Sequence, residues 1–352
     1  MRVLILTPTA LPSLTGNAIT AERWRRSLVS KGISVKVLPV DETPLPVLID
    51  EVDRFRPDLI HGHHAFRSGR FLLDPEVRGQ QGNIPFVVSP AGTDINGGLE
   101  DQEKREIVFG ICRLSRAVIA QGRGTVERMR TLLPELDGRL IPVPKSFMWF
   151  GDGPCDLRTA CGWTRDDFVF FMPAGIRPVK GNLECLGAVE KLHALRPQTR
   201  VVFAGPVLDR EYAVRFEKEI GRLRAIARWI PGIPPEAMRS AYGAADVVLN
   251  ASRAEGLSNV LLEAIACGKP VLASDVPGNR WAVLGKNGGP CGCLFEPGNT
   301  GDFVSQAVRI IDDRSLRETM ARTGLARAGR WPDPGTEAEC LLTIYRKALA
   351  LS

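Results

Sequence analysis

Residues 247–273 read VVLNASRAEGLSNVLLEAIACGKPVLA, and this stretch decides the fold class. The short apolar runs at 247–250 and 271–273 are typical of buried strands, and residues 258–267 between them follow a helical period. A helix that joins two such strands is a crossover connection, which makes the strands parallel. The stretch therefore predicts an α/β domain built on a parallel sheet.

The same alternation of strand and helix runs along the rest of the chain in two series. The first series of strands is expected at 3–7, 35–38, 59–63, 86–89, 117–120 and 140–141, and the second at 168–172, 201–203, 228–230, 247–250, 271–273 and 293–295. Residues 142–156, rich in Pro, Gly and aromatics, interrupt this rhythm and predict a linker. We expect an N-terminal Rossmann-like domain of residues 1–148, joined by a C-terminal helix in 334–352, and a second domain of residues 155–333.

Two tandem doubly wound domains that face a cleft suit a large bipartite ligand, because such sheets bind ligands at the carboxyl ends of their strands. The length of 352 residues and an apolar fraction of 44% fit two ordinary globular domains. Neither half contains a G-x-G-x-x-G fingerprint or a G-x-x-x-x-G-K-[ST] loop, so the sequence does not support a standard dinucleotide or P-loop site.

Charge and cysteine content narrow the class of protein further. The 46 Lys and Arg against 40 Asp and Glu are spread along the chain, whereas a nucleic-acid partner calls for a clustered basic footprint. Basic residues on the first predicted helix permit contact with anionic lipid, although a solvated face is their more common role; they are Arg23, Arg25, Arg26 and Lys31. Eight dispersed cysteines and the absence of a signal-peptide or membrane-span pattern favour a cytoplasmic protein with reduced thiols. Nothing in the sequence fixes the oligomeric state.

Two carboxylates separated by seven residues, Glu255 and Glu263, are the strongest chemical pattern. The helix predicted to begin near Ser258 directs backbone N–H groups and the positive end of its dipole at whatever lies before it, which favours a diphosphate. Glu263 can accept hydrogen bonds from ribose hydroxyls, and Glu255 from a transferred sugar. The alternative is a capping acid followed by a surface acid.

A basic loop, residues 173–181, follows the first strand of the second series, where such a sheet places a ligand. Its Arg177 and Lys180, together with a helix terminus, can neutralise a diphosphate leaving group without Mg²⁺. No Asp-x-Asp triplet occurs in the sequence, which agrees with a metal-free site. Taken alone, an Arg-x-x-Lys pattern in a loop usually belongs to a solvent-exposed surface without a binding role.

These two patterns resemble the retaining glycosyltransferases of family four, whose two-lobed fold is called GT-B, and the resemblance covers nearly the whole chain. Four shorter segments are similar to the "glycosyltransferase 1 domain-containing protein 1" group within that family; they are 15–17, 173–180, 204–209 and 277–279.

The resemblance implies a role for each matching residue. Arg177 and Lys180 would bind the donor diphosphate, Glu255 the donor sugar and Glu263 the ribose. Further donor contacts would come from the backbone amides of Leu257, Ser258 and Asn259, from Gly205, from the loop that contains Gly232 and Ile233, and from Gly16 and Asn17. For Gly16 and Asn17 a plain turn is the competing interpretation.

In the N-terminal half, three histidines occur together as His61, His63 and His64. The resemblance places His63 near the reacting sugar, in an orienting or hydrogen-bonding role, and a packed structural role is as common for such a residue. Thr93, Asp94 and Asn96 form a polar cluster near the expected acceptor, where the sequence departs from the family pattern. A turn and helix-cap role for Asp94 is the alternative.

We therefore expect a retaining, metal-independent glycosyltransferase with Arg177, Lys180, Glu255 and His63 as its catalytic residues. Its partners would be a nucleotide-diphosphate sugar, which is a co-substrate and not a cofactor, and a small-molecule or glycan acceptor. Alternatives of the same fold are a nucleotide-sugar epimerase, a phosphorylase or a non-catalytic binding protein. A metal hydrolase that uses His61 and His63 is a further alternative, although few other ligands are available.

Overall fold

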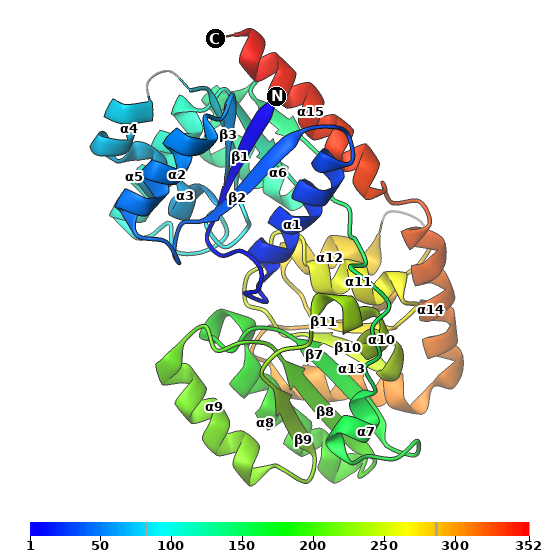
Figure 1. Cartoon of the computed structure of the whole chain (residues 1–352). Helices are drawn as coiled ribbons and strands as arrows, with labels where there is room; N and C mark the ends of the chain where they lie inside the picture. The colour runs from blue at the N-terminus through cyan, green and yellow to red at the C-terminus, as the bar shows by residue number, and fades with distance from the viewer. Residues whose placement is uncertain (82–83, 286–287, 352) are drawn as a thin grey trace. The chain divides into compact units, whose positions relative to one another are not determined.

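The chain folds into two compact units in the computed structural model, which describes residues 1–81, 84–285 and 288–351. Unit 1 comprises Met1–Met148 and Pro332–Ser352, and unit 2 comprises Trp149–Trp331. Each unit is a parallel sheet with helices on both faces (Figure 1). The predicted fold class of two doubly wound α/β domains is confirmed.

Unit 1 contains a six-stranded sheet in the order β2-β1-β3-β4-β5-β6, with every pair parallel. Its strands are β1 Arg2–Thr7, β2 Ser34–Pro39, β3 Leu59–His63, β4 Phe86–Ser89, β5 Ala117–Ala120 and β6 Leu140–Pro142. Its helices are α1 Gly16–Val29, α2 Leu45–Phe55, α3 Ala65–Leu73, α4 Pro75–Gln81, α5 Gln102–Leu114, α6 Arg123–Leu132, the 3₁₀ turn η1 Pro134–Leu136, and α15 Pro334–Ala350.

Alternate residues of β1 pack into two separate cores of unit 1, because successive side chains of a strand point to opposite faces of the sheet. Leu4 and Leu6 pack with residues of α2 to α6. Val3 and Ile5 pack on the other face with residues of α1 and α15. The C-terminal helix thus completes the core of the unit in which the chain begins.

Unit 2 contains a second six-stranded sheet in the order β12-β11-β10-β7-β8-β9, again all parallel. Its strands are β7 Phe168–Pro173, β8 Thr199–Ala204, β9 Ala227–Ile230, β10 Val247–Asn250, β11 Val271–Ser274 and β12 Gly292–Phe295. Its helices are α7 Leu157–Cys161, α8 Asn182–Leu195, α9 Arg210–Arg222, α10 Met238–Ala244, α11 Asn259–Ala266, α12 Pro277–Leu284, α13 Thr300–Asp312 and α14 Arg314–Ala328, with the 3₁₀ turns η2 Pro178–Lys180 and η3 Pro235–Ala237.

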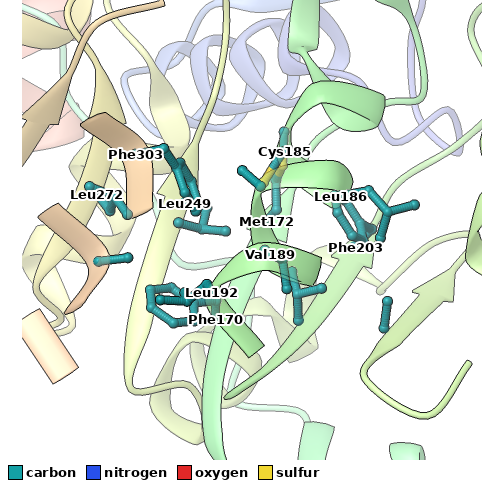
Figure 2. Packing of buried hydrophobic residues seen from close by; sticks show 14 of the residues in the cluster. Phe170, Met172, Cys185, Leu186, Val189, Leu192, Phe203, Leu249, Leu272 and Phe303 are labelled. Atoms are coloured by element: carbon teal, nitrogen blue, oxygen red, sulfur yellow. The ribbon is translucent and has the colours of Figure 1, made fainter. Parts of the chain in front are cut away.

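The main core of unit 2 is one continuous layer of apolar side chains between its sheet and the helices of one face. Figure 2 shows Phe170 and Leu249 of the sheet beside Leu192 of α8 and Phe303 of α13. Burial of such side chains contributes about 1.5–3 kcal/mol each relative to exposure. This rigid sheet positions the loops that follow its strands.

All twelve predicted strands are present within about two residues of their expected bounds, but four short helices were not predicted. The unpredicted helices are α3, α4, α7 and α12. Each has nine residues or fewer, and α12 contains a Pro and a Gly, which obscure the helical period.

The predicted linker is only partly a linker, because residues 149–154 belong to unit 2. The ring of Trp149 lies edge-on to that of Tyr242, with 6.1 Å between the centroids. The Gly153 N–H donates to the Glu236 carbonyl at 2.8 Å. No helix or strand lies between β6 and α7, a stretch that is fully described.

Of the four basic residues that the sequence placed on one face, Arg23 is buried, whereas the side chains of Arg25 and Arg26 are 38% and 45% exposed. The side chain of Arg23 is 2% exposed and pairs with Glu337 of α15, whose side chain is 1% exposed. Arg25 and Arg26 both pair with Glu22, and Lys31 pairs with Glu339. The three arginines of α1 and Lys31, which follows the helix, thus all have carboxylate partners inside unit 1.

Candidate functional site

In each unit the main candidate residues lie near the two strands between which the winding of the sheet reverses. In unit 2 the reversal lies between the neighbouring strands β7 and β10, and a loop follows each of them. In unit 1 the corresponding strands are β1 and β3. Such switch points are where open α/β sheets bind their ligands.

The loop after β7 and the loop after β10 bring Lys180 and Glu255 together. Lys180 Nζ lies 2.5 Å from Glu255 Oε1, and their side chains are 18% and 11% exposed. Ser252 Oγ donates to the same carboxylate oxygen at 2.7 Å. Arg177 precedes η2, and its N–H donates to Asn182 Oδ1 at 3.3 Å, which ties the basic loop to the start of α8. The two sequence patterns therefore form one site.

A buried network of neutral polar side chains supports the Glu255 loop. Asn250 at the end of β10 donates to Ser258 Oγ at 3.0 Å, and its Oδ1 accepts the Ser252 N–H at 3.1 Å. The Asn279 amide donates to Ser274 Oγ and to the Ser274 carbonyl, both at 3.1 Å. All five of these residues are at most 5% exposed. Because buried polar groups are costly unless satisfied, this network favours a single loop conformation.

Close backbone packing fixes the same loop from the side of α12. A Cβ atom at Gly278 would lie 2.4 Å from the Glu255 carbonyl oxygen and 2.5 Å from that of Gly256. Only glycine permits this approach without a shift of the backbone. The segment 277–279 is thus part of the site's support.

Helix α11 begins at Asn259, and its N-cap Ser258 makes no side-chain capping bond. The Ser258 hydroxyl is instead held by Asn250, and Leu257 is 9% exposed. The positive end of the α11 dipole therefore lies directly after the Glu255 loop, and such an end attracts anions.

Glu263, one turn further along α11, accepts a hydrogen bond from the hydroxyl of Tyr242 at 2.8 Å. Tyr242 is fully buried, and burial, together with the negative charge of Glu263, raises the pKa of its phenol. The hydroxyl therefore stays protonated and orients one carboxylate oxygen of Glu263. The sequence prediction did not include Tyr242.

Gly205 holds the β7 and β8 loops close together. Its φ is +154°, and a Cβ there would lie 2.4 Å from the Ala174 carbonyl oxygen. Its own carbonyl accepts from Trp229 Nε1 at 3.0 Å. In the loop after β9, Gly232 is half-buried, while the side chain of Ile233 is 6% exposed and belongs to the core, which leaves main-chain groups of this loop for any ligand contact.

In unit 1, Gly16 and Asn17 form the first turn of α1, after the loop that follows β1. The N-cap is Thr15, whose hydroxyl accepts the Ala18 N–H at 3.2 Å. Gly16 is exposed and Asn17 is half-buried. The pair therefore belongs to a capped helix start and not to an isolated turn.

His61 and His63 both lie on β3, and a serine of the neighbouring strand joins them. His61 Nε2 is 2.8 Å from Ser89 Oγ, and His63 Nδ1 is 3.2 Å from the same atom. His61 Nδ1 is 2.6 Å from the hydroxyl of Tyr345 on α15. The indole of Trp24 stacks on His61 at 4.8 Å and meets His63 edge-on at 4.9 Å.

Both imidazoles are neutral at neutral pH. Burial lowers the pKa of His61 to about 3. Burial also lowers the pKa of His63 well below 6.5, assisted by the neighbouring imidazoles of His61 and His64 and by the positive charges of Lys145 and Arg23. His63 can therefore orient a ligand by hydrogen bonding, but it does not carry a proton to be given away as an acid at neutral pH.

In the structure Asp94 has the capping role that was the alternative to acceptor binding. Asp94 is fully buried, and its two carboxylate oxygens accept the N–H groups of Ala65 at 2.6 Å and of Ala91 at 3.0 Å. Thr93 and Asn96 are half-buried in the same loop, and acceptor binding by Thr93, Asp94 and Asn96 stays a prediction.

Among the described residues, no group of three or more His, Cys, Asp or Glu side chains is arranged to hold a metal ion. Both ring nitrogens of His61 are engaged by Tyr345 and Ser89, so His61 is not a ligand of the kind that the hydrolase alternative requires. Within the same residues, no helix is both long enough and apolar enough to cross a membrane.

Comparisons with known proteins agree with this geometry. Residues 157–327 match the family model described as Glycosyl transferases group 1. "Glycosyltransferase 1 domain-containing protein 1" of Xenopus tropicalis is 24% identical over 333 residues, 91% of this chain and 90% of that protein. The D-inositol 3-phosphate glycosyltransferase of Paenarthrobacter aurescens is 28% identical over 335 residues, 89% of this chain and 80% of that protein. The crystal structure of Anabaena HepE in complex with UDP-glucose has a TM-score of 0.79 at 19% identity, covering 98% of this chain and 100% of that one.

Proposed function

We propose that this chain, whose residues 157–327 match the model of the group 1 family, is a retaining, metal-independent glycosyltransferase that uses a nucleotide-diphosphate sugar as donor. The observation that carries the proposal is the meeting of Lys180, Glu255 and the start of α11 at the switch point of unit 2. A cation and a helix N-terminus can bind the diphosphate of a nucleotide sugar, and a carboxylate can accept hydrogen bonds from the sugar hydroxyls.

The basic loop and α11 would stabilise the leaving diphosphate. Negative charge develops on that group as the glycosidic bond breaks, and preorganised positive groups at that point lower the barrier. Lys180 is held in place before the donor arrives by its bond to Glu255. Arg177 supplies the second cation, and no metal ion is needed in this mechanism.

Glu255 and Glu263 would orient the donor. Glu255 has one oxygen on Lys180 and Ser252, and we assign its carboxylate to hydroxyls of the transferred sugar. Glu263, oriented by Tyr242, is assigned to the ribose hydroxyls. The acceptor attacks from the face that the leaving group vacates, which gives retention. We place acceptor binding in unit 1, with Thr93 and Asn96 as candidates, and the protein in the cytoplasm, where its eight free thiols stay reduced.

The donor can be identified by thermal stabilisation with uridine, guanosine, adenosine and cytidine diphosphates and their sugars, in EDTA. A ligand at 100 times its Kd stabilises the folded state by about 2.7 kcal/mol. We expect one base to raise the melting temperature and Lys180→Met to abolish the rise. Lys218→Met on the exposed face of α9 is the matched control and should keep it. A folded chain that binds none of these ligands would contradict the proposal.

Retention is tested by the anomeric configuration of the first product, read by NMR from the sugar proton coupling before mutarotation. We expect the product to have the configuration of the donor. Inversion would contradict the mechanism while leaving the donor site intact. Incubation with donor alone separates transfer from epimerisation, because an epimerase needs no acceptor.

A further inference from the structure

Unit 1 contains a buried chain of side-chain hydrogen bonds that ends at His63. The chain runs from Tyr345 Oη to His61 Nδ1, from His61 Nε2 to Ser89 Oγ, and from Ser89 Oγ to His63 Nδ1. All four residues are at most 5% exposed. His63 Nε2 is buried and has no hydrogen-bond partner among the described residues.

The direction of this chain follows from the hydrogen-bonding capacity of Tyr345. A tyrosine hydroxyl has one proton to donate, and within the described part of the chain the hydroxyl of Tyr345 has one partner, His61 Nδ1. If His61 donated to Tyr345, the hydroxyl proton would be buried without an acceptor. A buried donor that lacks a partner costs its full desolvation free energy. Tyr345 is therefore the donor.

Once Tyr345 donates, every other proton in the chain is fixed. A neutral imidazole carries one N–H, so His61 with an accepting Nδ1 donates through Nε2 to Ser89. The single hydroxyl proton of Ser89 is then directed to His63 Nδ1. His63 accepts at Nδ1 and consequently has its own proton on Nε2. With all protons reversed, two buried groups would be unpaired, namely the Tyr345 hydroxyl proton and the His63 Nε2 lone pair. With Tyr345 as donor, only the His63 Nε2–H is unpaired.

We propose that Tyr345, His61 and Ser89 form a directed relay that fixes the tautomer of His63, so that His63 presents an Nε2–H donor to a hydroxyl oxygen of the substrate. The contact with a substrate oxygen rests on the proposed function, whereas the tautomer of His63 does not. Tyr345, His61 and Ser89 are positioning residues, because they act through His63.

The C-terminal helix has a defined part in this arrangement. Glu337 and Tyr345 are eight residues apart on α15 and hence on one face of it. Glu337 accepts from the indole N–H of Trp24 at 2.7 Å, and Trp24 packs on both imidazoles. Burial raises the pKa of Tyr345, so its hydroxyl keeps its proton at neutral pH. Helix α15 thereby fixes both the ring positions and the proton order.

The test is the tautomer of each histidine in the ligand-free full chain, read from the ring nitrogens by ¹⁵N NMR of histidine-labelled protein at neutral pH. The four histidines are assigned with single His→Gln variants. We expect His61 and His63 to carry their protons on Nε2. A proton on Nδ1 of either ring would overturn the proposal, and this result does not depend on any donor or on activity.

Two variants test the relay itself. In Tyr345→Phe the direction is no longer set, and we expect the Nδ1–H form to appear at both His61 and His63. In Ser89→Ala the link is cut, so His61 should keep its tautomer while His63 gains the Nδ1–H form. Ile344→Val, which removes one buried methyl group from the same helix beside Tyr345, is the control and should leave the tautomers of His61 and His63 unchanged. Unchanged tautomers in both variants would overturn the relay.

Turnover supplies a second readout once the donor is known. A glutamine amide can place an N–H near the position of Nε2, whereas an asparagine amide reaches only as far as Nδ1. We expect His63→Gln to retain at least ten times the kcat of His63→Asn. Equal losses in the two variants would contradict a donor role for Nε2.

Discussion

Glu337 is the residue whose loss should damage unit 1 most. It accepts from Arg23 Nε at 3.0 Å and Nη2 at 3.2 Å, from Trp24 Nε1 at 2.7 Å and from the Ser146 N–H at 3.3 Å. Gln121 donates to it as well. Glu337→Gln conserves the shape but removes the charge, and it leaves the Arg23 guanidinium uncompensated in a site where its side chain is 2% exposed.

Breaking a buried ion pair by removing one partner costs about 3–5 kcal/mol. Total stabilities are about 5–15 kcal/mol, so the loss is a large fraction of the stability of unit 1. Unit 1 has 169 residues. For a domain of that size each kcal/mol lowers the melting temperature by about 2–4 °C, which predicts a fall of roughly 6–20 °C.

Urea unfolding followed by ¹⁹F NMR of fluorotryptophan-labelled protein measures this loss in unit 1 alone. Trp24 is the tryptophan of unit 1, and the other five lie in the sequence of unit 2. The control is Glu339→Gln, the same change two residues away, where an exposed carboxylate pairs with Lys31. An exposed pair contributes about 0–1 kcal/mol. If Glu337→Gln loses no more stability than Glu339→Gln, the reasoning about burial is refuted.

Three further perturbations follow from the geometry. Tyr242→Phe removes the hydroxyl that orients Glu263. This change should weaken nucleotide binding by roughly 2–10-fold, about 0.5–1.5 kcal/mol, and leave the melting temperature of the nucleotide-free protein nearly unchanged. Unchanged nucleotide binding would show that Tyr242 is not part of the site. Gly205→Ala should destabilise unit 2 by at least about 1–3 kcal/mol, measured by urea unfolding, because its Cβ would lie 2.4 Å from the Ala174 carbonyl oxygen; wild-type stability would show that this loop can shift freely. The pKa of His61 is about 3 in the folded protein and 6.5 ordinarily, so between these pH values the unfolded chain binds one more proton than the folded chain. The stability of unit 1 should therefore fall as the pH is lowered from 6.5 toward 3. A urea midpoint of the Trp24 resonance that does not change over this range would contradict the burial of His61.

The sequence predicted the twelve strands and the fold class because apolar runs and turn residues are local features. It also selected Lys180 and Glu255 separately, as parts of two patterns 75 residues apart. Their direct ion pair depends on β7 and β10 being neighbours, which is a property of strand order. Strand order is set by the packing of the whole sheet and is not visible in either pattern.

Other parts of the site were missed because their partners are far apart in the sequence. Tyr345 lies 284 residues from His61, and Glu337 lies 314 residues from Arg23. Nothing near Tyr345 or Glu337 in the sequence points to a site. Ser89 was closer to prediction, since the register pairs it with His63 across adjacent strands.

Asp94 shows an ambiguity of local sequence. Its position after a strand, among polar residues, is equally typical of a ligand-binding residue and of a capping residue. Its burial and its two backbone contacts became visible only in the fold, because the burial of a single side chain cannot be predicted from local sequence. The same applies to Arg23, which the charge pattern grouped with surface residues and the fold placed in the interior.

We propose that Lys180 and its neighbours bind a nucleotide diphosphate without a metal ion. Calorimetric titration of the selected nucleoside diphosphate into the full chain, once in EDTA and once in Mg²⁺, measures this binding directly. We expect the same Kd in both buffers and a Kd about 10–100-fold weaker in Lys180→Met, since a hydrogen bond to a charged group contributes about 1.5–3 kcal/mol. Lys218→Met should bind like the wild type. Binding that requires Mg²⁺, or that survives Lys180→Met unchanged, would contradict a metal-free diphosphate site at Lys180.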